Sequence, residues 1–405
     1  MTTAETEPHS PPDPDREWLG ARLEELSAIH RPSASPGERR AAEWIVARFA
    51  ELGAEARIES ERAHGTYWWP LGIGAAASAL ANAAALRGHR LTAAALGAAA
   101  GAALVDEFPP GKRRWIRERL VHGHTYNVIS ELGPADAERT VVVVAHHDAA
   151  HSGLIFHPEI PETIFRRWGV PIDLFDTSPA LMWPLLASPA LAVAAGLTGG
   201  RAVAKLGGLL GAGYVAAMAE IGAREVVPGA NDNATAVILL LALARRLIDE
   251  PTGSTRVILL STGSEESFSE GMKAFGERHF RDLPRESTFF LCVDTLGSPT
   301  LNILRGEGFV RMHEYPADAL ALIDGLAEEL GIQTVPNLRL RNGTDGLESL
   351  AAGYKTVTLC SVTDLKQPAN YHWPSDVAEN VNLGTLSDAV RLSEALIRRL
   401  DERWL

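Results

Sequence analysis

Cysteine is scarce in this chain, since Cys292 and Cys360 are the only two among 405 residues. Both stand in apolar, strand-like runs, so we expect two buried free thiols, with a disulfide between neighbouring strands as the alternative. Their separation differs from the paired spacing of cysteine-based zinc sites, which excludes that class of metal site.

An excess of basic residues is also lacking: 38 lysines and arginines stand against 51 acidic residues, and the formal net charge is −13. Without a basic stripe to replace counterions on phosphate, we expect no nucleic-acid partner. The N-terminus has no basic segment followed by an apolar run, so no secretory signal peptide is expected. Its proline, acidic and small residues favour a disordered tail over residues 1–16.

Apolar residues make up 46% of the chain, which is sufficient for a large core. After residue 123, runs rich in β-branched residues alternate with amphipathic segments. This alternation predicts an α/β fold in which a mostly parallel, mixed β-sheet is sandwiched by helices. The clearest expected strands are 140–146, 254–262 and 287–294, and the clearest expected helices are 233–248, 316–330 and 384–402. Ligands bind such sheets at the carboxyl ends of the strands.

Two Ala/Gly-rich segments, 67–105 and 178–221, interrupt this alternation. Each is predicted to form a helical hairpin with a basic tip. A 15-residue helix is about 22 Å long and falls short of a hydrocarbon core of ~30 Å. Extending the first helix back to Tyr67 gives an adequate span with an aromatic end.

Two interpretations fit these hairpins. The favoured one is membrane association through 67–105 and 178–221; the alternative is a cytoplasmic protein whose hairpins pack on the main domain or on a second subunit. The basic tips indicate that the tips face the cytoplasm. That orientation conflicts with the missing signal sequence, so the sequence leaves the orientation open.

Metal-binding residue types follow several of the expected strands. They are His146 and Asp148, Glu265 and Glu266, and Asp294, joined by Asp232 before a helix and by His372 in a late loop. Each residue alone has an ordinary interpretation: Asp232, for example, could be a helix N-cap. Together, two histidines and three carboxylates suit two divalent ions that share one carboxylate. Of two adjacent carboxylates, one can bind metal while the other transfers a proton.

The order of these residues resembles the M28 zinc aminopeptidases. The matching motifs are His146-His147-Asp148, Pro228-Gly-Ala-Asn-Asp232-Asn-Ala-Thr235, Glu265-Glu266, Asp294 and Tyr371-His372. The resemblance covers about 17–66, 106–177 and 222–405. It implies one M28-like peptidase domain over 17–405, with a zinc-peptidase/phosphorylase-hydrolase-like fold interrupted by the two hairpins.

Carried over by position, the resemblance implies two Zn²⁺ ions. One ion would be bound by His146 and Asp294 and the other by Glu266 and His372, with Asp232 bridging them. Glu265 would be the general base, Asp148 would orient the histidine ligand, and Tyr371 would stabilise the oxyanion. The chain departs from the family pattern at Asn231, at Ala236 and in the Asn342–Gly346 stretch, where a family histidine is missing.

The expected function is therefore a two-zinc hydrolase that cleaves peptide or small amide bonds, as an aminopeptidase removing N-terminal residues. One alternative is a glutaminyl-cyclase-like acyltransferase, which uses a single zinc and would not need all five ligands. The others are a non-catalytic, membrane-associated binding module on the same fold and a membrane scaffold or transporter with a regulatory hydrolase domain. No residue set for holding a free amino group is evident, and the oligomeric state has no signature.

Overall fold

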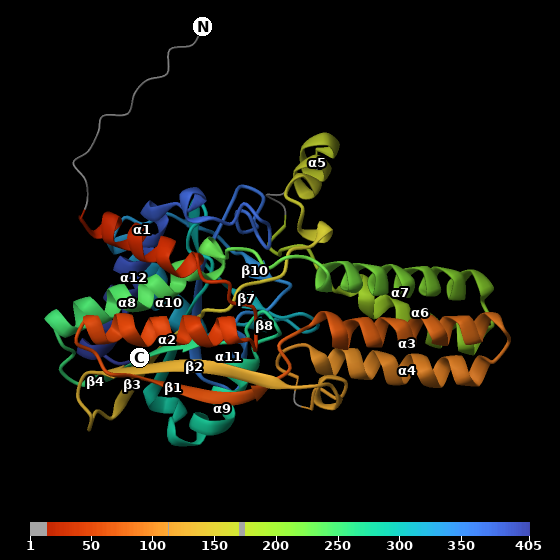
Figure 1. Cartoon of the computed structure of the whole chain (residues 1–405), viewed down its shortest axis with the longest axis horizontal. Coiled ribbons are helices and arrows are strands. Elements are labelled where there is room, and N and C mark those ends of the chain that lie inside the picture. Colours follow the sequence, from red (N-terminus) through yellow and green to blue (C-terminus); the bar gives the residue numbers. More distant parts are fainter. Residues whose placement is uncertain (1–13, 112, 170–174) are drawn as a thin grey trace, which may run out of the picture.

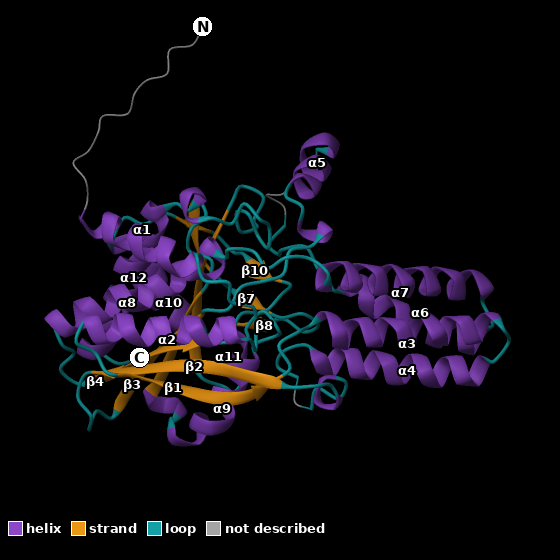
Figure 2. Ribbon diagram, viewed as in Figure 1, coloured by secondary structure: helices purple, strands orange, loops and turns teal. Residues whose placement is uncertain are grey.

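The computed structural model describes residues 14–111, 113–169 and 175–405. Figure 1 shows two parts: an α/β body, and a bundle of four helices that projects from one side of the body. The same view coloured by secondary structure shows that the strands are confined to the body (Figure 2).

An eight-stranded sheet forms the centre of the body, in the order β1-β2-β4-β3-β5-β11-β6-β9. Its strands are β1 (Ala56–Ala63), β2 (Gly123–Leu132), β3 (Arg139–His146), β4 (Thr255–Thr262), β5 (Thr288–Val293), β6 (Thr300–Ile303), β9 (Thr334–Val335) and β11 (Lys355–Val362). The central strands β4, β3, β5 and β11 are parallel, whereas β1 and β2 pair antiparallel with their neighbours. Strand β6 is antiparallel to β11 and parallel to β9. The predicted mixed, mostly parallel sheet is confirmed.

A second, three-stranded sheet contains β7 (Gly306–Glu307), β8 (His313–Glu314) and β10 (Arg339–Leu340).

Helices cover both faces of the large sheet. One face packs against α1 (Pro14–Ser27), α2 (Pro36–Glu51), α8 (Thr235–Asp249), α10 (Ala317–Glu329) and α12 (Leu383–Glu402), and the other against α9 (Glu270–His279), with α11 (Gly346–Ala351) packing on α9, β5 and β11. Strand β3 is buried on both faces, because Val141 and Val143 contact the first helix layer while Val142 and Val144 contact the second. Its run of β-branched residues is the signal of a doubly covered strand.

The N-terminal boundary requires one correction. Residues 14–16 were expected to belong to a disordered tail, but α1 begins at Pro14. Proline suits the first turn of a helix, and the carboxylate of Asp15 pairs with Arg245 and Arg246 on α8, which fixes this turn to the body. The rest of the expected tail, residues 1–13, lies outside the described residues. Helix α5 (Glu159–Trp168) was not predicted from the sequence.

The four apolar helices expected in the two hairpins are present as α3 (Trp68–Leu86), α4 (Arg90–Glu107), α6 (Trp183–Thr198) and α7 (Arg201–Gly222). The hairpins pack on each other rather than separately on the body: α3 lies along α7, and α4 lies along α6. In the described part of the chain, α3 and α7 have the length and apolar composition of a membrane span.

Both cysteines are buried and free, as predicted. Cys292 lies in β5 and Cys360 in the neighbouring β11. Burial raises the pKa of the Cys360 thiol to about 12, so this thiol is an unreactive part of the core.

Candidate functional site

The candidate metal-binding residues meet at the carboxyl edge of the central strands. His146 is the last residue of β3 and Asp294 directly follows β5, while Glu265 and Glu266 lie just beyond β4. The register of β3 and β4 ends with His146 opposite Thr262, so these strand ends are neighbours. The parallel sheet thus brings together residues that are more than a hundred positions apart in the chain.

Asp232 lies between two histidines. Its Oδ1 is 3.3 Å from Nε2 of His146, and its Oδ2 is 3.3 Å from Nε2 of His372. The residue lies in the short irregular segment before α8, and it is not a helix N-cap, because Ala234 occupies the N-cap position of α8. Each carboxylate oxygen therefore faces a different imidazole.

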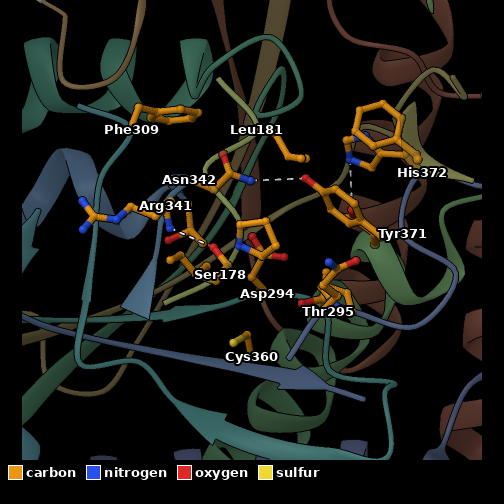
Figure 3. A pocket seen from close by; sticks show the side chains of 18 of the residues that line it. Ser178, Leu181, Asp294, Thr295, Phe309, Arg341, Asn342, Cys360, Tyr371 and His372 are labelled. Carbon is orange, nitrogen blue, oxygen red and sulfur yellow. Dashed lines mark hydrogen bonds and ion pairs between the residues drawn. The ribbon is translucent and has the colours of Figure 1, made fainter. Parts of the chain in front are cut away.

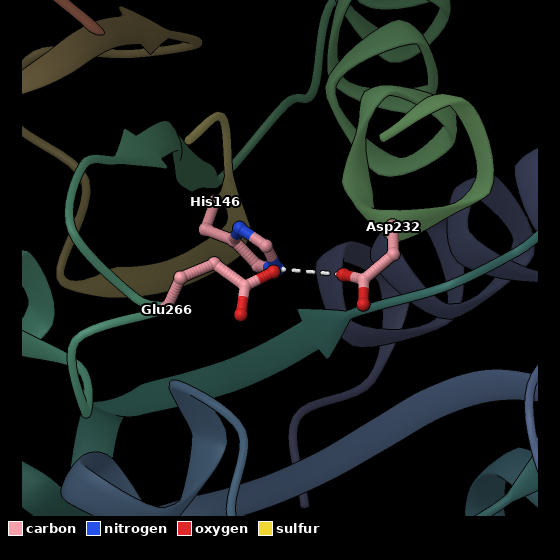
Figure 4. Close-up of side chains that lie close together, drawn as sticks. All are labelled: His146, Asp232 and Glu266. Carbon is pink, nitrogen blue, oxygen red and sulfur yellow. Dashed lines mark ion pairs between the residues drawn. The ribbon is translucent and has the colours of Figure 1, made fainter. Parts of the chain in front are cut away.

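The other predicted ligands complete two groups around this shared carboxylate. Nε2 of His372 lies 3.1 Å from Oε2 of Glu266, and Nε2 of His146 lies 3.9 Å from Oδ2 of Asp294. Three of these residues, His146, Asp232 and Glu266, each offer one ligand atom, and the three atoms lie within 4.8 Å of one another (Figure 4). We call the set His146, Asp232, Glu266, Asp294 and His372 the five-residue cage. The structure brings all five together.

The buried carboxylate of Asp148 stabilises this arrangement. Its Oδ1 lies 3.3 Å from Nδ1 of His146 and accepts the backbone N–H of Glu265 at 3.0 Å. Its Oδ2 accepts the backbone N–H of Glu266 at 3.1 Å and the hydroxyl of Ser33 at 2.6 Å. One buried carboxylate thus orients the imidazole and also fixes the two glutamates.

The electrostatics of the cage are dominated by crowded carboxylates. Burial raises the pKa of Glu265 and of Asp294 well above the usual range, and the neighbouring carboxylates raise both further. Burial alone would lower the pKa of His372, but Glu266 and Asp232 outweigh it and raise that pKa to about 10. Negative charge in this small volume exceeds what two imidazoles can balance.

This donor set fits divalent cations. Imidazole nitrogens and carboxylate oxygens are the ligands of catalytic zinc, and two dications would relieve the repulsion among the carboxylates. The buried Oε1 of Glu266 has no hydrogen-bond partner among the described residues, although it faces the cage. Such an oxygen is available as a ligand.

Two supporting residues were not predicted from the sequence. The buried guanidinium of Arg31 donates to the carbonyl oxygens of His147 at 2.7 Å, Pro228 at 2.6 Å and Gly229 at 2.6 Å, and so ties the loop after β3 to the loop carrying Asp232. An arginine in a loop carries no local signal of this role. Asp376 accepts the backbone N–H groups of Asn231 at 2.7 Å and of Asp232 at 3.1 Å. Its position four residues after His372 was the only available signal.

Comparison with known proteins relates part of the chain to a family. A family model described as peptidase family M28 matches residues 203–397, which include Asp232, Glu266, Asp294 and His372. Residues 203–397 are therefore similar to peptidase family M28. Comparison with curated protein sequences gives no match.

Solved structures share the fold of this chain. An aminopeptidase from Aneurinibacillus sp. strain AM-1 is 14% identical, with a TM-score of 0.56 over 95% of this chain and 93% of that chain. Tannerella forsythia glutaminyl cyclase is 12% identical, with a TM-score of 0.56 over 96% and 99%. A Zn-dependent exopeptidase from Parabacteroides distasonis ATCC 8503 is 11% identical, with a TM-score of 0.52 over 97% and 100%. At these identities the likeness shows the fold, which is the expected zinc-peptidase-like one.

Four of the five cage residues line a pocket, and Figure 3 shows two of them, Asp294 and His372. Asp232, Glu265, Glu266, Asp294 and His372 line it together with a largely aromatic and aliphatic wall of Tyr67, Phe156, Leu181, Met182, Phe268 and Phe309. The Tyr371 hydroxyl accepts a hydrogen bond from the side-chain amide of Asn342 at 3.3 Å across the pocket. The pocket is therefore charged at one end and apolar along its wall.

A buried carboxylate supports one wall of the pocket. Glu307 accepts the backbone N–H of Thr344 at 2.7 Å and the Tyr315 hydroxyl. Burial raises the pKa of Glu307 to about 7. The folded chain therefore holds a proton here between pH 4.5 and 7 that the unfolded chain releases, so the contribution of Glu307 to folding stability falls as pH rises through this window.

The Glu307→Gln variant should remove this pH dependence. Relative to the wild type, it should be equally stable near pH 4 and progressively more stable up to pH 7–8, by as much as about 3 kcal/mol. Thermal unfolding measured at a series of pH values checks this. The exposed Glu286→Gln is the matched control and should leave the profile unchanged. Parallel profiles for wild type and Glu307→Gln would contradict the assignment.

Proposed function

We propose that this chain is a two-metal hydrolase of the M28 type that cleaves amide bonds and acts as an aminopeptidase on short peptides. The observation that carries the proposal is the position of Asp232, whose two carboxylate oxygens each lie 3.3 Å from a different histidine. A carboxylate placed in this way suits a bridge between two cations.

The ligand assignment is the one that the resemblance to the M28 peptidases implies, and the contacts around Asp232 are compatible with it. His146 and Asp294 would hold one ion, Glu266 and His372 the other, and Asp232 both. Zinc bound there would lower the pKa of water and polarise the scissile carbonyl. Zinc is favoured because the ligands are imidazole and carboxylate and because an exopeptidase of the same fold is named as Zn-dependent.

Glu265 is the proton carrier in this proposal. It lines the pocket beside the cage, and its Oε2 lies 3.8 Å from Nε2 of His146. The resemblance to the M28 peptidases makes it the general base rather than a metal ligand. The Glu265 carboxylate takes a proton from the attacking water and then gives it to the leaving amine. The carboxylate of Asp148 keeps Glu265 in position by accepting a hydrogen bond from the backbone N–H of Glu265.

Tyr371 supplies the remaining group. Its hydroxyl accepts from Asn342, which leaves its own proton free to donate to the oxyanion that forms when water attacks the carbonyl. The apolar wall of the pocket favours substrates with a bulky apolar side chain next to the scissile bond.

The competing activity is glutaminyl cyclisation, since the chain shares its fold with glutaminyl cyclases as well as with aminopeptidases. Such an acyltransferase uses a single zinc. Retention of both His146 and Asp294 beside Asp232 favours two ions. A non-catalytic binding module would have no need of the complete cage.

Metal analysis and an activity panel test the proposal together. We expect about two zinc ions per chain, hydrolysis of chromogenic aminoacyl amides with apolar residues preferred, loss of activity after chelation, and recovery with zinc. One zinc per chain with release of ammonia from N-terminal glutamine would instead establish the cyclase. Fewer than one zinc per chain with untouched aminoacyl amides would refute both enzymes.

A further inference from the structure

The four-helix bundle has its apolar side chains on the outside. Ten large apolar side chains on these helices are exposed: Trp69, Ile73, Leu80, Leu91, Leu96, Val105, Trp183, Leu197, Leu206 and Leu209. Leu80 is 66% exposed, Leu209 71% and Leu91 87%. A helix on the surface of a water-soluble bundle presents charged and polar residues there instead.

The residues inside the bundle are mostly small, and some of them are polar. Away from the body, its buried positions are alanine, glycine, serine, asparagine and proline. The amide of Asn82 donates to the Ser188 carbonyl at 3.0 Å, and the Ser188 hydroxyl donates to the Gly207 carbonyl at 2.8 Å, which links α3, α6 and α7. At Gly97 of α4, a Cβ atom would lie 2.9 Å from the Pro189 carbonyl of α6. Close backbone contact through small residues, with hydrogen bonds between helices, is how helices associate in lipid.

Charges are confined to the ends of the bundle helices. No acidic or basic residue occurs in 68–86, 91–105, 183–198 or 206–219. At the far end, the guanidinium of Arg90 donates to the Gly196 carbonyl at 3.0 Å and that of Arg201 to the Leu86 carbonyl at 3.0 Å, so the basic tips also satisfy exposed helix ends. The helices have 16 to 22 residues, or about 24–33 Å at 1.5 Å per residue. This matches a hydrocarbon core of ~30 Å.

The opposite end of the bundle carries an aromatic and amphipathic rim. Trp69 and Trp183 stand at the starts of α3 and α6 and are exposed. Beside this end, α5 stands clear of the body with its axis crossing the direction of the bundle (Figure 1). It exposes Ile160, Ile164 and Trp168 at a spacing of four residues, next to two arginines. Two glutamates balance these arginines, so α5 is amphipathic without net charge. Tryptophans at a boundary and an amphipathic helix across it are typical of the membrane–water interface.

We propose that the bundle α3-α4-α6-α7 spans a lipid bilayer, with α5 lying in the interface and the catalytic body outside. The occupant of the apolar surface is lipid, because that surface surrounds the helices along the length of a hydrocarbon core and ends at charges on one side and at tryptophans on the other. The pocket over the cage then opens near the interface, since its wall includes Leu181 and Met182 at the start of α6 and Tyr67 at the start of α3.

Flotation with vesicles of neutral and anionic phospholipid tests membrane insertion. Full-length protein purified in detergent and reconstituted should float almost completely, and it should remain with the vesicles in high salt and in alkaline carbonate. The double variant Leu80→Lys with Leu209→Lys, which places charges on the exposed apolar surface, should float at least tenfold less while its circular dichroism is retained. The control Leu405→Lys changes an exposed leucine of the body and should float like the wild type. Release by salt or carbonate, or a monomer that is soluble without detergent, would overturn the proposal.

Labelling distinguishes spanning from shallower binding and from self-association. Arg87→Cys reports the tip, Leu405→Cys reports the body, and the two native cysteines are buried. With an impermeant maleimide added outside sealed vesicles, the labelled fractions of the two variants should be complementary. Full labelling of both would place the tip and the body on the same side and overturn spanning.

A fluorophore at Leu209→Cys tests what covers the apolar surface. Its emission should shift to the blue only with vesicles. The same shift in a detergent-free dimer would identify a second copy of the chain as the occupant and refute the lipid assignment.

Discussion

Glu265→Gln is expected to lower kcat/KM for aminoacyl amides by about 10²–10⁴-fold while leaving the metal content unchanged. General acid–base catalysis contributes about this much. Glutamine keeps the shape of the side chain and its place on the pocket wall, but it cannot accept a proton from water. Since Glu265 stands beside the two ligand groups rather than within either, both ions should stay bound.

The neighbouring glutamate provides the matched control. Glu266→Gln changes a residue of the same type, one position away, whose Oε2 lies 3.1 Å from Nε2 of His372. This variant should lose metal from that group, so the two variants should differ in metal content although both lose activity. Parallel measurement of bound metal and initial rates separates them. Full activity of Glu265→Gln would remove Glu265 as the proton carrier.

The cage was predictable because its chemistry coincides with the strongest sequence signals. Strands buried on both faces are continuous apolar runs, and a histidine or a carboxylate directly after such a run stands out. His146 after β3 and Asp294 after β5 are examples. In a parallel sheet these strand ends meet at one edge, so the sequence pattern also predicts that the residues converge.

Other parts of the site depend on contacts that leave no local pattern. Arg31 joins two loops by donating to three backbone carbonyls, and the sequence around Arg31 does not predict which carbonyls these are. The packing of the two hairpins into one bundle relies on small residues such as Gly97 and Gly196, which lie against a neighbouring helix. In the sequence these glycines indicate neither the contact nor the helix that makes it. The short helix α5 was missed because ten residues that include Pro161 give too little periodicity to distinguish a helix from a loop.

Metal content also tests the bridging role of Asp232, which carries the largest expected loss. In Asp232→Asn the side chain keeps its size but loses its charge, and an NH₂ group replaces one of the two oxygens that face His146 and His372. Because an amide NH₂ donates rather than accepts hydrogen bonds and cannot bind a cation, at least one ion should be lost and the affinity for the other weakened. Hydrolysis should fall at least as far as in Glu265→Gln.

Asp345→Asn is the appropriate comparison for Asp232→Asn. Asp345 is a buried carboxylate near the cage, but it accepts a hydrogen bond from the Thr262 hydroxyl, which an asparagine oxygen can also do. Its variant should keep both ions. Thermal unfolding gives a readout independent of activity: zinc bound to the native state should raise the melting temperature of the wild type and of Asp345→Asn, but much less that of Asp232→Asn. If Asp232→Asn binds two ions per chain and is stabilised by zinc like the wild type, Asp232 does not bridge the metals.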